Sequence, residues 1–317
     1  SLIYYGIIES ASSPAELTLG FYIAPQFEYS FEDIQGSYSP GRPIRIADME
    51  NPGPSVQAEL ERQSDLIAQL TLGLTQVQLG NSDAALAAFE QAAQADPNLA
   101  VVQFFVGREN LFLAGLKPDQ RASYRQAAEA AFQKAIALDN EYARGYIGLG
   151  SVYTDSAAEL LDEAIASGQP LDPQTIEFIE QAIQNYQEVL DLDLDPEAYG
   201  SPVADVARIA LGHAYRLEGV AATLQGDVPG ALATFEQAIT QLMEVRTTFE
   251  TLTQNNESHR RYLAQVYEYL GETYQWQGYA HELSFAYSEA VQSYQQALSA
   301  YKQCTAQAEN SPDLIIR

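Results

Sequence analysis

From Val56 onward, apolar residues recur at intervals of three and four among many Gln, Ala, Glu and Leu residues. This is the periodicity of amphipathic helices, in which such positions share one face. The pattern therefore predicts helices over the rest of the chain, separated where Gly, Pro and Asn gather. We expect long helices at about 143–166 and 174–192, and another that runs to about Leu252 before a loop at Asn255.

The first 54 residues have a different pattern. β-Branched and aromatic residues fill positions 2–8 and 17–23, and residues 44–46 form a third short candidate strand. Proline and glycine separate these runs, and Asn-Pro-Gly-Pro at 51–54 ends the region. Because three short strands are marginal by themselves, we expect residues 1–54 to be either the end of a truncated α/β domain or a β cap on the helices.

One series of residues recurs within the helical part. It first appears as Leu72-Gly73, then Ala85, Phe89 and Ala92, and ends at Asp96-Pro97. Glycine and alanine allow two helices to approach closely, the aromatic ring fills the space between neighbouring hairpins, and proline suits the start of the next helix. The later glycine and aromatic positions are Gly107 and Phe132, Gly150 and Tyr186, Gly212 and Phe235, and Gly271 and Tyr294.

This series resembles the tetratricopeptide repeat, a helix–turn–helix unit of 34 residues. About five divergent repeats cover residues 56–307. The resemblance implies a mainly all-α fold, an irregular superhelix of helical hairpins preceded by a short β-containing segment, which looks like the strand-rich part before repeat arrays in some bacterial multidomain proteins. We expect the repeat domain at 55–309, with units at about 66–99, 100–142, 143–198, 203–252 and 260–307.

The spacing within the units is uneven. Gly73 and Phe89 are 16 residues apart, the family value, whereas the last two units have 23 residues between the motif glycine and the aromatic residue. The additional seven residues correspond to about two helical turns. We expect them to be shared between the two helices of each hairpin, one turn each.

The resemblance also implies a place for a ligand, because proteins of this family usually bind on the concave face built by the first helix of each unit. We therefore expect a protein or peptide partner there. The arginines of this face could hold an acidic peptide through bidentate pairs, or could pair with the chain's own carboxylates. Tryptophan is common both at interface hot spots and in cores. The candidate groove residues are Arg108, Phe112, Arg144, Ile147, Thr154, His213, Arg216 and Trp276.

Charge excludes several classes of partner. The chain has 317 residues, with 43 acidic against 16 basic side chains and a formal net charge of −27. Such a surface repels nucleic acids and anionic lipid headgroups, so we expect neither as a partner. No apolar run approaches the roughly 18 residues of a membrane span, so we expect no direct membrane insertion by these residues.

Motifs for catalysis or metal binding are missing from the sequence. Cys304 is the single cysteine, which excludes an internal disulfide and a cysteine metal cluster. No two histidines lie three or four residues apart, and the chain lacks phosphate-loop and nucleophile-elbow motifs. Asp191–Asp195 resembles the start of a calcium loop, but Pro196 replaces the required glycine. We expect no enzyme activity, metal or cofactor in these residues.

Two functions stay open at this point. The chain could be an interaction scaffold, or the regulatory or sensor arm of a larger signalling or enzymatic protein whose catalytic part lies elsewhere. Because the chain begins at Ser1 inside a candidate strand, we expect the natural N-terminus to lie upstream. The compartment, cytoplasmic or exported, is left open by the sequence.

Overall fold

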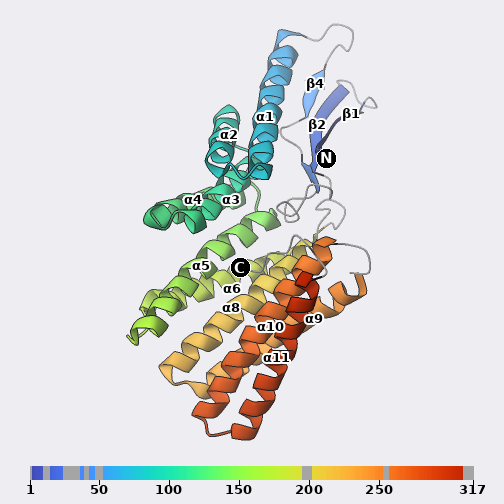
Figure 1. Cartoon of the computed structure of the whole chain (residues 1–317). Coiled ribbons are helices and arrows are strands. Elements are labelled where there is room, and N and C mark those ends of the chain that lie inside the picture. Colours follow the sequence, from blue (N-terminus) through green and yellow to red (C-terminus); the bar gives the residue numbers. More distant parts are fainter. Residues whose placement is uncertain are drawn as a thin grey trace. The chain divides into compact units, whose positions relative to one another are not determined.

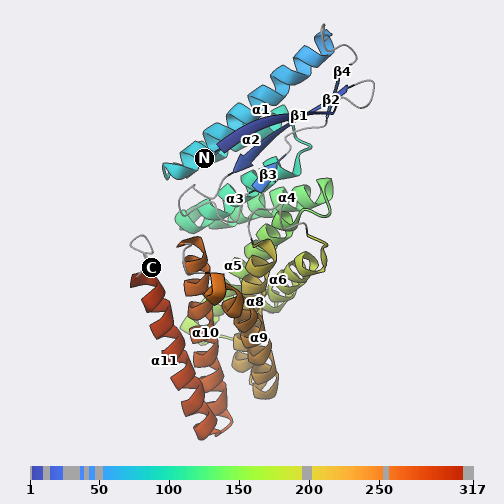
Figure 2. The same cartoon turned by 90° about the vertical axis from the view of Figure 1, so that its right-hand side faces the viewer.

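The computed structural model describes residues 2–9, 15–23, 36–38, 43–46, 53–194, 202–252 and 257–309. These form four strands followed by helices that are joined in pairs (Figures 1 and 2). The chain divides into two compact units, residues 1–149 with 193–203 (unit 1) and residues 150–192 with 204–317 (unit 2). The mainly all-α fold class with an N-terminal strand segment is confirmed.

The strands of unit 1 form one antiparallel sheet around β2 (Ala15–Ile23). β1 (Leu2–Glu9) pairs with β2 along its whole length, while β3 (Gly36–Tyr38) and β4 (Ile44–Ile46) pair with opposite ends of it. Three of these strands match the predicted runs. The sequence did not indicate β3 because its three residues, Gly-Ser-Tyr, contain no β-branched side chain and no alternation.

The sheet packs against the first helix, α1 (Pro54–Gln78), as Figure 1 shows. Proline at the first helical position starts α1, since its missing N–H would have no partner there anyway. Ile44, Ile46 and Val56 form a small buried cluster, which ties β4 to the start of α1. Tyr38 of β3 extends this contact to the next hairpin, because its ring lies 6.1 Å from that of Phe105.

The helical hairpins of unit 1 are held by rings that lie on glycines. Its further elements are α2 (Ser82–Ala95), α3 (Ala100–Leu116), the short 3-10 helix η2 (Pro118–Gln120), α4 (Arg121–Leu138) and the start of α5 (Ala143–Ser167). A Cβ atom on Gly73 would lie 2.3 Å from the Phe89 ring, and one on Gly107 would lie 2.8 Å from the Phe132 ring. Side chains larger than glycine would therefore separate the helices at these points.

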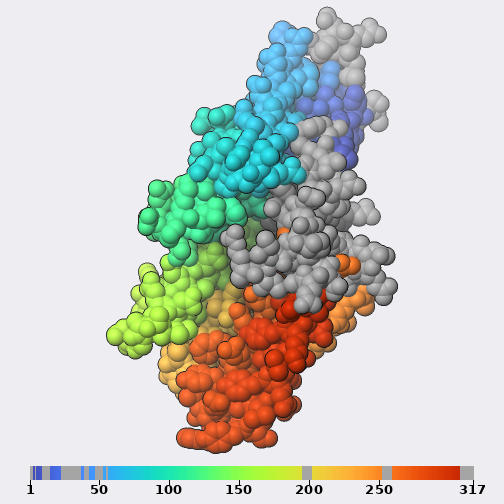
Figure 3. Space-filling model, viewed as in Figure 1, coloured from blue at the N-terminus to red at the C-terminus, as the bar shows by residue number. Residues whose placement is uncertain are grey.

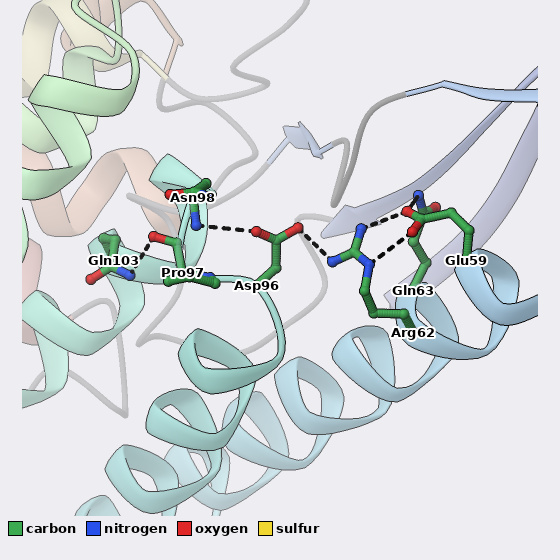
Figure 4. A network of polar contacts seen from close by, with 7 residues as sticks. All are labelled: Glu59, Arg62, Gln63, Asp96, Pro97, Asn98 and Gln103. Atoms are coloured by element: carbon green, nitrogen blue, oxygen red, sulfur yellow. Dashed lines mark hydrogen bonds and ion pairs between the residues drawn. The ribbon is translucent and has the colours of Figure 1, made fainter. Parts of the chain in front are cut away.

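A polar network fixes the loop between α2 and α3 to α1 (Figure 4). Arg62 on α1 donates to Asp96 in this loop at 2.5 Å and to both carboxylate oxygens of Glu59 at 2.5 and 2.9 Å. Gln103 of α3 donates to the carbonyl oxygen of Pro97 at 3.2 Å. The hydrogen bond from Arg62 lowers the pKa of Glu59, so this carboxylate stays ionised next to the guanidinium.

Unit 2 contains three long hairpins. α5 and α6 match the predicted helices to within one residue at each end, and α9 ends at Leu252 as predicted. The loop expected at Asn255 lies outside the described residues. The elements after α5 are α6 (Pro173–Asp191), α8 (Val203–Gln225), α9 (Val228–Leu252), α10 (Glu257–Leu283) and α11 (Tyr287–Glu309).

The last two hairpins correct the predicted register of the repeat. The Phe235 ring lies against Gly219 rather than Gly212, and the Tyr294 ring lies against Gly278 rather than Gly271. Both pairs are 16 residues apart, the value that Gly73 and Phe89 have in the first hairpin. The register was ambiguous because seven residues are almost two helical turns, so both glycines of each helix lie on the same face.

The additional residues form one further layer at the end of each hairpin away from its turn. Gly212 lies against Leu242, and Gly271 lies against Tyr301. Leu242 and Tyr301 each follow the hairpin's aromatic residue by seven positions. Each helix is therefore longer by two turns, and not by the one turn predicted.

Candidate binding site

Unit 2 contains a pocket of about 640 Å³ among the ends of its helices. Its walls come from the carboxyl-terminal ends of α5 and α8, the loop after α5, the second half of α10, and α11. This volume is in the range of pockets that bind small ligands. The apolar and aromatic lining includes Ile165, Leu171, Leu224, Trp276, Tyr279 and Tyr294.

Glycines in the left-handed region shape two of these walls. Gly168, with φ of 66°, follows the end of α5, and Gly226, with φ of 83°, follows the end of α8. Glycine adopts this conformation without a Cβ penalty, which is why it commonly ends helices. The helices stop there, and their last turns present Ile165 and Leu224 to the pocket, where these side chains are 45% and 40% exposed.

Aromatic rings form the wall on α10 and α11. The rings of Trp276 and Tyr279 meet edge to face, with centroids 5.8 Å apart. This geometry is favourable for aromatic pairs. Burial raises the pKa of Tyr294, and the charge of Glu282 raises it further, so this hydroxyl remains a hydrogen-bond donor at neutral pH. Three glutamines, at 169, 225 and 275, add polar groups to the lining.

The predicted groove residues of unit 1 have partners within the chain. Arg108 donates to Glu109 at 3.0 Å, and the guanidinium of Arg144 lies 5.1 Å from the centre of the Tyr38 ring. Arg144 is only 4% exposed, so the structure does not place it on an open groove. Of the two predicted apolar residues, Phe112 is 54% exposed and Ile147 is half-buried.

Thr154 is buried as well. Its hydroxyl donates to the carbonyl oxygen of Gly150 at 2.8 Å and lies 2.9 Å from the hydroxyl of Tyr186. Thr154 therefore provides a hydrogen-bond partner for the buried Tyr186 hydroxyl between α5 and α6, and it does not line an open face.

His213 and Arg216 belong to an internal cluster of unit 2. Arg216 donates to Nε2 of His213 at 2.8 Å and forms an ion pair with Glu272 at 3.2 Å. The ring of His213 lies 4.3 Å from that of Tyr269. Burial lowers the pKa of His213 well below its usual range, and the charge of Arg216 lowers it further, so the histidine is neutral and accepts this hydrogen bond.

Among the eight predicted residues, Trp276 lines the pocket. Leu224 and Tyr279 were missed because the face was counted from Gly212 and Gly271, seven residues before the glycines that contact the aromatic rings. The signal that could have found them is the pair of helix-ending glycines, Gly168 and Gly226, each next to an apolar last turn. Within the described ranges, no three His, Cys, Asp or Glu side chains are grouped so that they could hold a metal ion.

The described helices include none that is long and apolar enough to cross a bilayer.

Comparison with known proteins gives one family match. Residues 67–99 match the model of the tetratricopeptide repeat. No curated protein matches the chain.

Several solved structures are similar. The MamA protein is 18% identical, with 76% of this chain and 94% of that chain covered and a TM-score of 0.45. TTC0263, a thermophilic TPR protein of Thermus thermophilus, is 20% identical, with 74% and 98% covered and a TM-score of 0.36. PilF of Pseudomonas aeruginosa is 16% identical, with 80% and 96% covered and a TM-score of 0.35.

Because these TM-scores are below 0.5, the family assignment rests on the matched repeat and on the contacts of the chain itself. The matched residues contain the Gly73–Phe89 contact, and the same contact recurs at the same spacing in Gly219–Phe235 and Gly278–Tyr294. The chain therefore contains a tetratricopeptide repeat at residues 67–99, and later hairpins repeat its contact between a glycine and an aromatic ring.

Proposed function

We propose that this chain is a protein-interaction scaffold that binds a protein or peptide segment in the pocket of unit 2. Tetratricopeptide repeats generally serve as scaffolds for protein–protein interaction, since stacked hairpins build extended binding surfaces. The observation that carries the proposal is an open apolar pocket between the first helices of three successive hairpins, α5, α8 and α10.

The chemistry of the lining suits an anchored side chain. Leu224, Ile165 and Trp276 offer apolar surface, and interface hot spots commonly consist of an aromatic or aliphatic anchor in such a pocket. The glutamine amides and tyrosine hydroxyls around it can bond the polar backbone of a bound segment. The lining has no His, Asp, Glu or Lys side chain, which supports binding in preference to acid–base chemistry.

Selection from a random peptide library displayed on phage tests the proposal. Peptides selected on the full chain should bind it, and should lose about tenfold or more in affinity when Leu224→Glu places a charge in the pocket. Leu298→Glu is the matched control, because Leu298 is an exposed leucine of the same unit that lies outside the lining. Selected peptides that bind the Leu224→Glu variant as well as the original chain would contradict the proposal.

A further inference from the structure

The charge around the pocket has one sign. The stretches 145–207, 217–245 and 262–301 contain no lysine and no arginine. The residues that line the pocket all lie within these three stretches. The pocket is therefore apolar inside, and the helix segments that form it carry acidic side chains with no lysine or arginine among them.

Several carboxylates lie on the same helix faces as the lining residues. Asp162 precedes Ile165 by three residues, Glu282 follows Tyr279 by three, and Glu218 precedes position 225 by seven. Residues three, four or seven positions apart share a helix face, so these carboxylates flank the pocket along α5, α10 and α8. Asp162 and Glu282 are exposed, and Glu218 is half-buried.

Negative charge near the pocket affects the pKa of Glu218. Burial raises the pKa of Glu218, and the charge of Glu180 on the neighbouring helix raises it further. The raised pKa of Glu218 indicates a carboxyl group that has little compensating positive charge nearby. A cation placed beside it would relieve the repulsion from Glu180.

We infer that the pocket binds a cationic segment of another protein, one that inserts an apolar side chain and places Lys or Arg residues beside Asp162, Glu218 and Glu282. The inference rests on the proposed function and names the chemistry of its ligand. Opposite charges around an apolar contact steer association and select the partner. An acidic segment would meet like charge at each of these positions.

Arg216, the predicted groove arginine of unit 2, does not add positive charge to the pocket lining. Arg216 is engaged by His213 and Glu272, and it lies outside the pocket lining. The interpretation of an arginine groove for an acidic peptide therefore has no support at this pocket. The surface of α10 and α11, orange to red in Figure 3, is built mostly from a stretch without lysine or arginine.

Two synthetic peptides test the inference. Both carry leucine and phenylalanine at one face of a 14-residue amphipathic helix and lack tryptophan; their polar positions are Lys in one and Glu in the other. Because Trp276 is the single tryptophan of the chain and lines the pocket, its fluorescence reports binding. We expect the Lys peptide to change the Trp276 emission and the Glu peptide to leave it unchanged. The affinity of the Lys peptide should fall about tenfold between 0.05 and 0.5 M NaCl, since salt screens exposed charges.

Charge reversal provides the matched comparison. In the triple variant Asp162→Lys, Glu218→Lys and Glu282→Lys, the affinity for the Lys peptide should fall about tenfold or more. The same variant should bind the Glu peptide. The control Glu90→Lys, Asp119→Lys and Glu188→Lys changes the net charge equally at exposed positions outside the pocket lining, and should keep the original preference.

The outcomes separate this inference from the proposed function. If both peptides bind equally, or if the two triple variants lose affinity for the Lys peptide equally, the inference of a cationic ligand is wrong. The proposed pocket would still stand in that case, provided that Leu224→Glu weakens binding. If Leu224→Glu also leaves the binding of every peptide unchanged, the pocket itself is not the site.

Discussion

Three hairpin turns share one backbone conformation but not one residue type. The amides of Asn81, Asp227 and Ala286 donate to the carbonyl oxygen five residues earlier, each at 2.9 Å. The preceding residue is in the left-handed region in all three turns, and is Gly80 in the first and Gly226 in the second. In the third it is Phe285, with φ of 61° and 77% of its surface exposed.

This conformation is costly for phenylalanine, at about 1 kcal/mol or more for a residue with a Cβ atom. We therefore predict that Phe285→Gly raises the free energy of unfolding by about 1 kcal/mol, less the entropy that glycine adds to the unfolded chain. Urea denaturation measures the change. Phe285→Ala is the control, because it removes the ring but keeps the Cβ atom, and it should give no comparable gain. Equal stabilisation by both changes would show that the ring, and not the backbone, is the source of the cost.

Glycines in the helices should respond to alanine with opposite signs. A Cβ atom on Gly73 would meet the Phe89 ring at 2.3 Å, whereas one on Gly115 would meet no atom within 4 Å. We predict that Gly73→Ala lowers the free energy of unfolding by about 1–3 kcal/mol through overpacking, and that Gly115→Ala raises it by about 0.5–1 kcal/mol through helix propensity. Thermal unfolding of the two variants measures this, and a gain in stability for Gly73→Ala would contradict the described contact.

The sequence was sufficient for the contacts of the first three hairpins but not for the last two. Gly73–Phe89, Gly107–Phe132 and Gly150–Tyr186 are in contact as the repeat pattern predicts. In α8 and α10 a second glycine, seven residues later, occupies the same face, and periodicity alone cannot decide between the two.

At the scale of the elements, the long helices bring carboxylates together. Glu218 on α8 is half-buried and close enough to Glu180 on α6 for the charge of Glu180 to raise its pKa. A carboxyl group whose pKa is raised by folding binds its proton more tightly in the folded state. Its ionisation therefore costs stability once the pH rises through the folded pKa, and this cost disappears below the unfolded pKa.

We predict that Glu218→Gln raises the free energy of unfolding at pH 7, by about 0.5 kcal/mol for a group that solvent still reaches. The gain should fall toward zero as the pH is lowered to about 4, the ordinary range of a glutamate. Urea denaturation at a series of pH values tests this. Glu188→Gln, at an exposed position of α6, is the control and should change stability little. A gain from Glu218→Gln that is constant with pH would contradict the electrostatic explanation.

At the scale of the whole molecule, the matched repeat and the pocket lie in different compact units. Unit 1 joins an antiparallel sheet to the matched repeat, and unit 2 contains the pocket. The spacing of apolar residues predicted the helical class, which the structure confirms. It could not predict the pocket, because Ile165, Leu224 and Trp276 are more than 50 residues apart along the chain and meet only when three hairpins stack.

The most direct measurement is hydrogen–deuterium exchange of the whole chain with and without the Lys peptide. If the pocket of unit 2 holds this peptide, exchange should slow in the loop 168–171 and at the end of α8, and it should stay unchanged in α1 to α4. Slower exchange confined to unit 1, or unchanged exchange around the pocket at saturating peptide, would contradict the account.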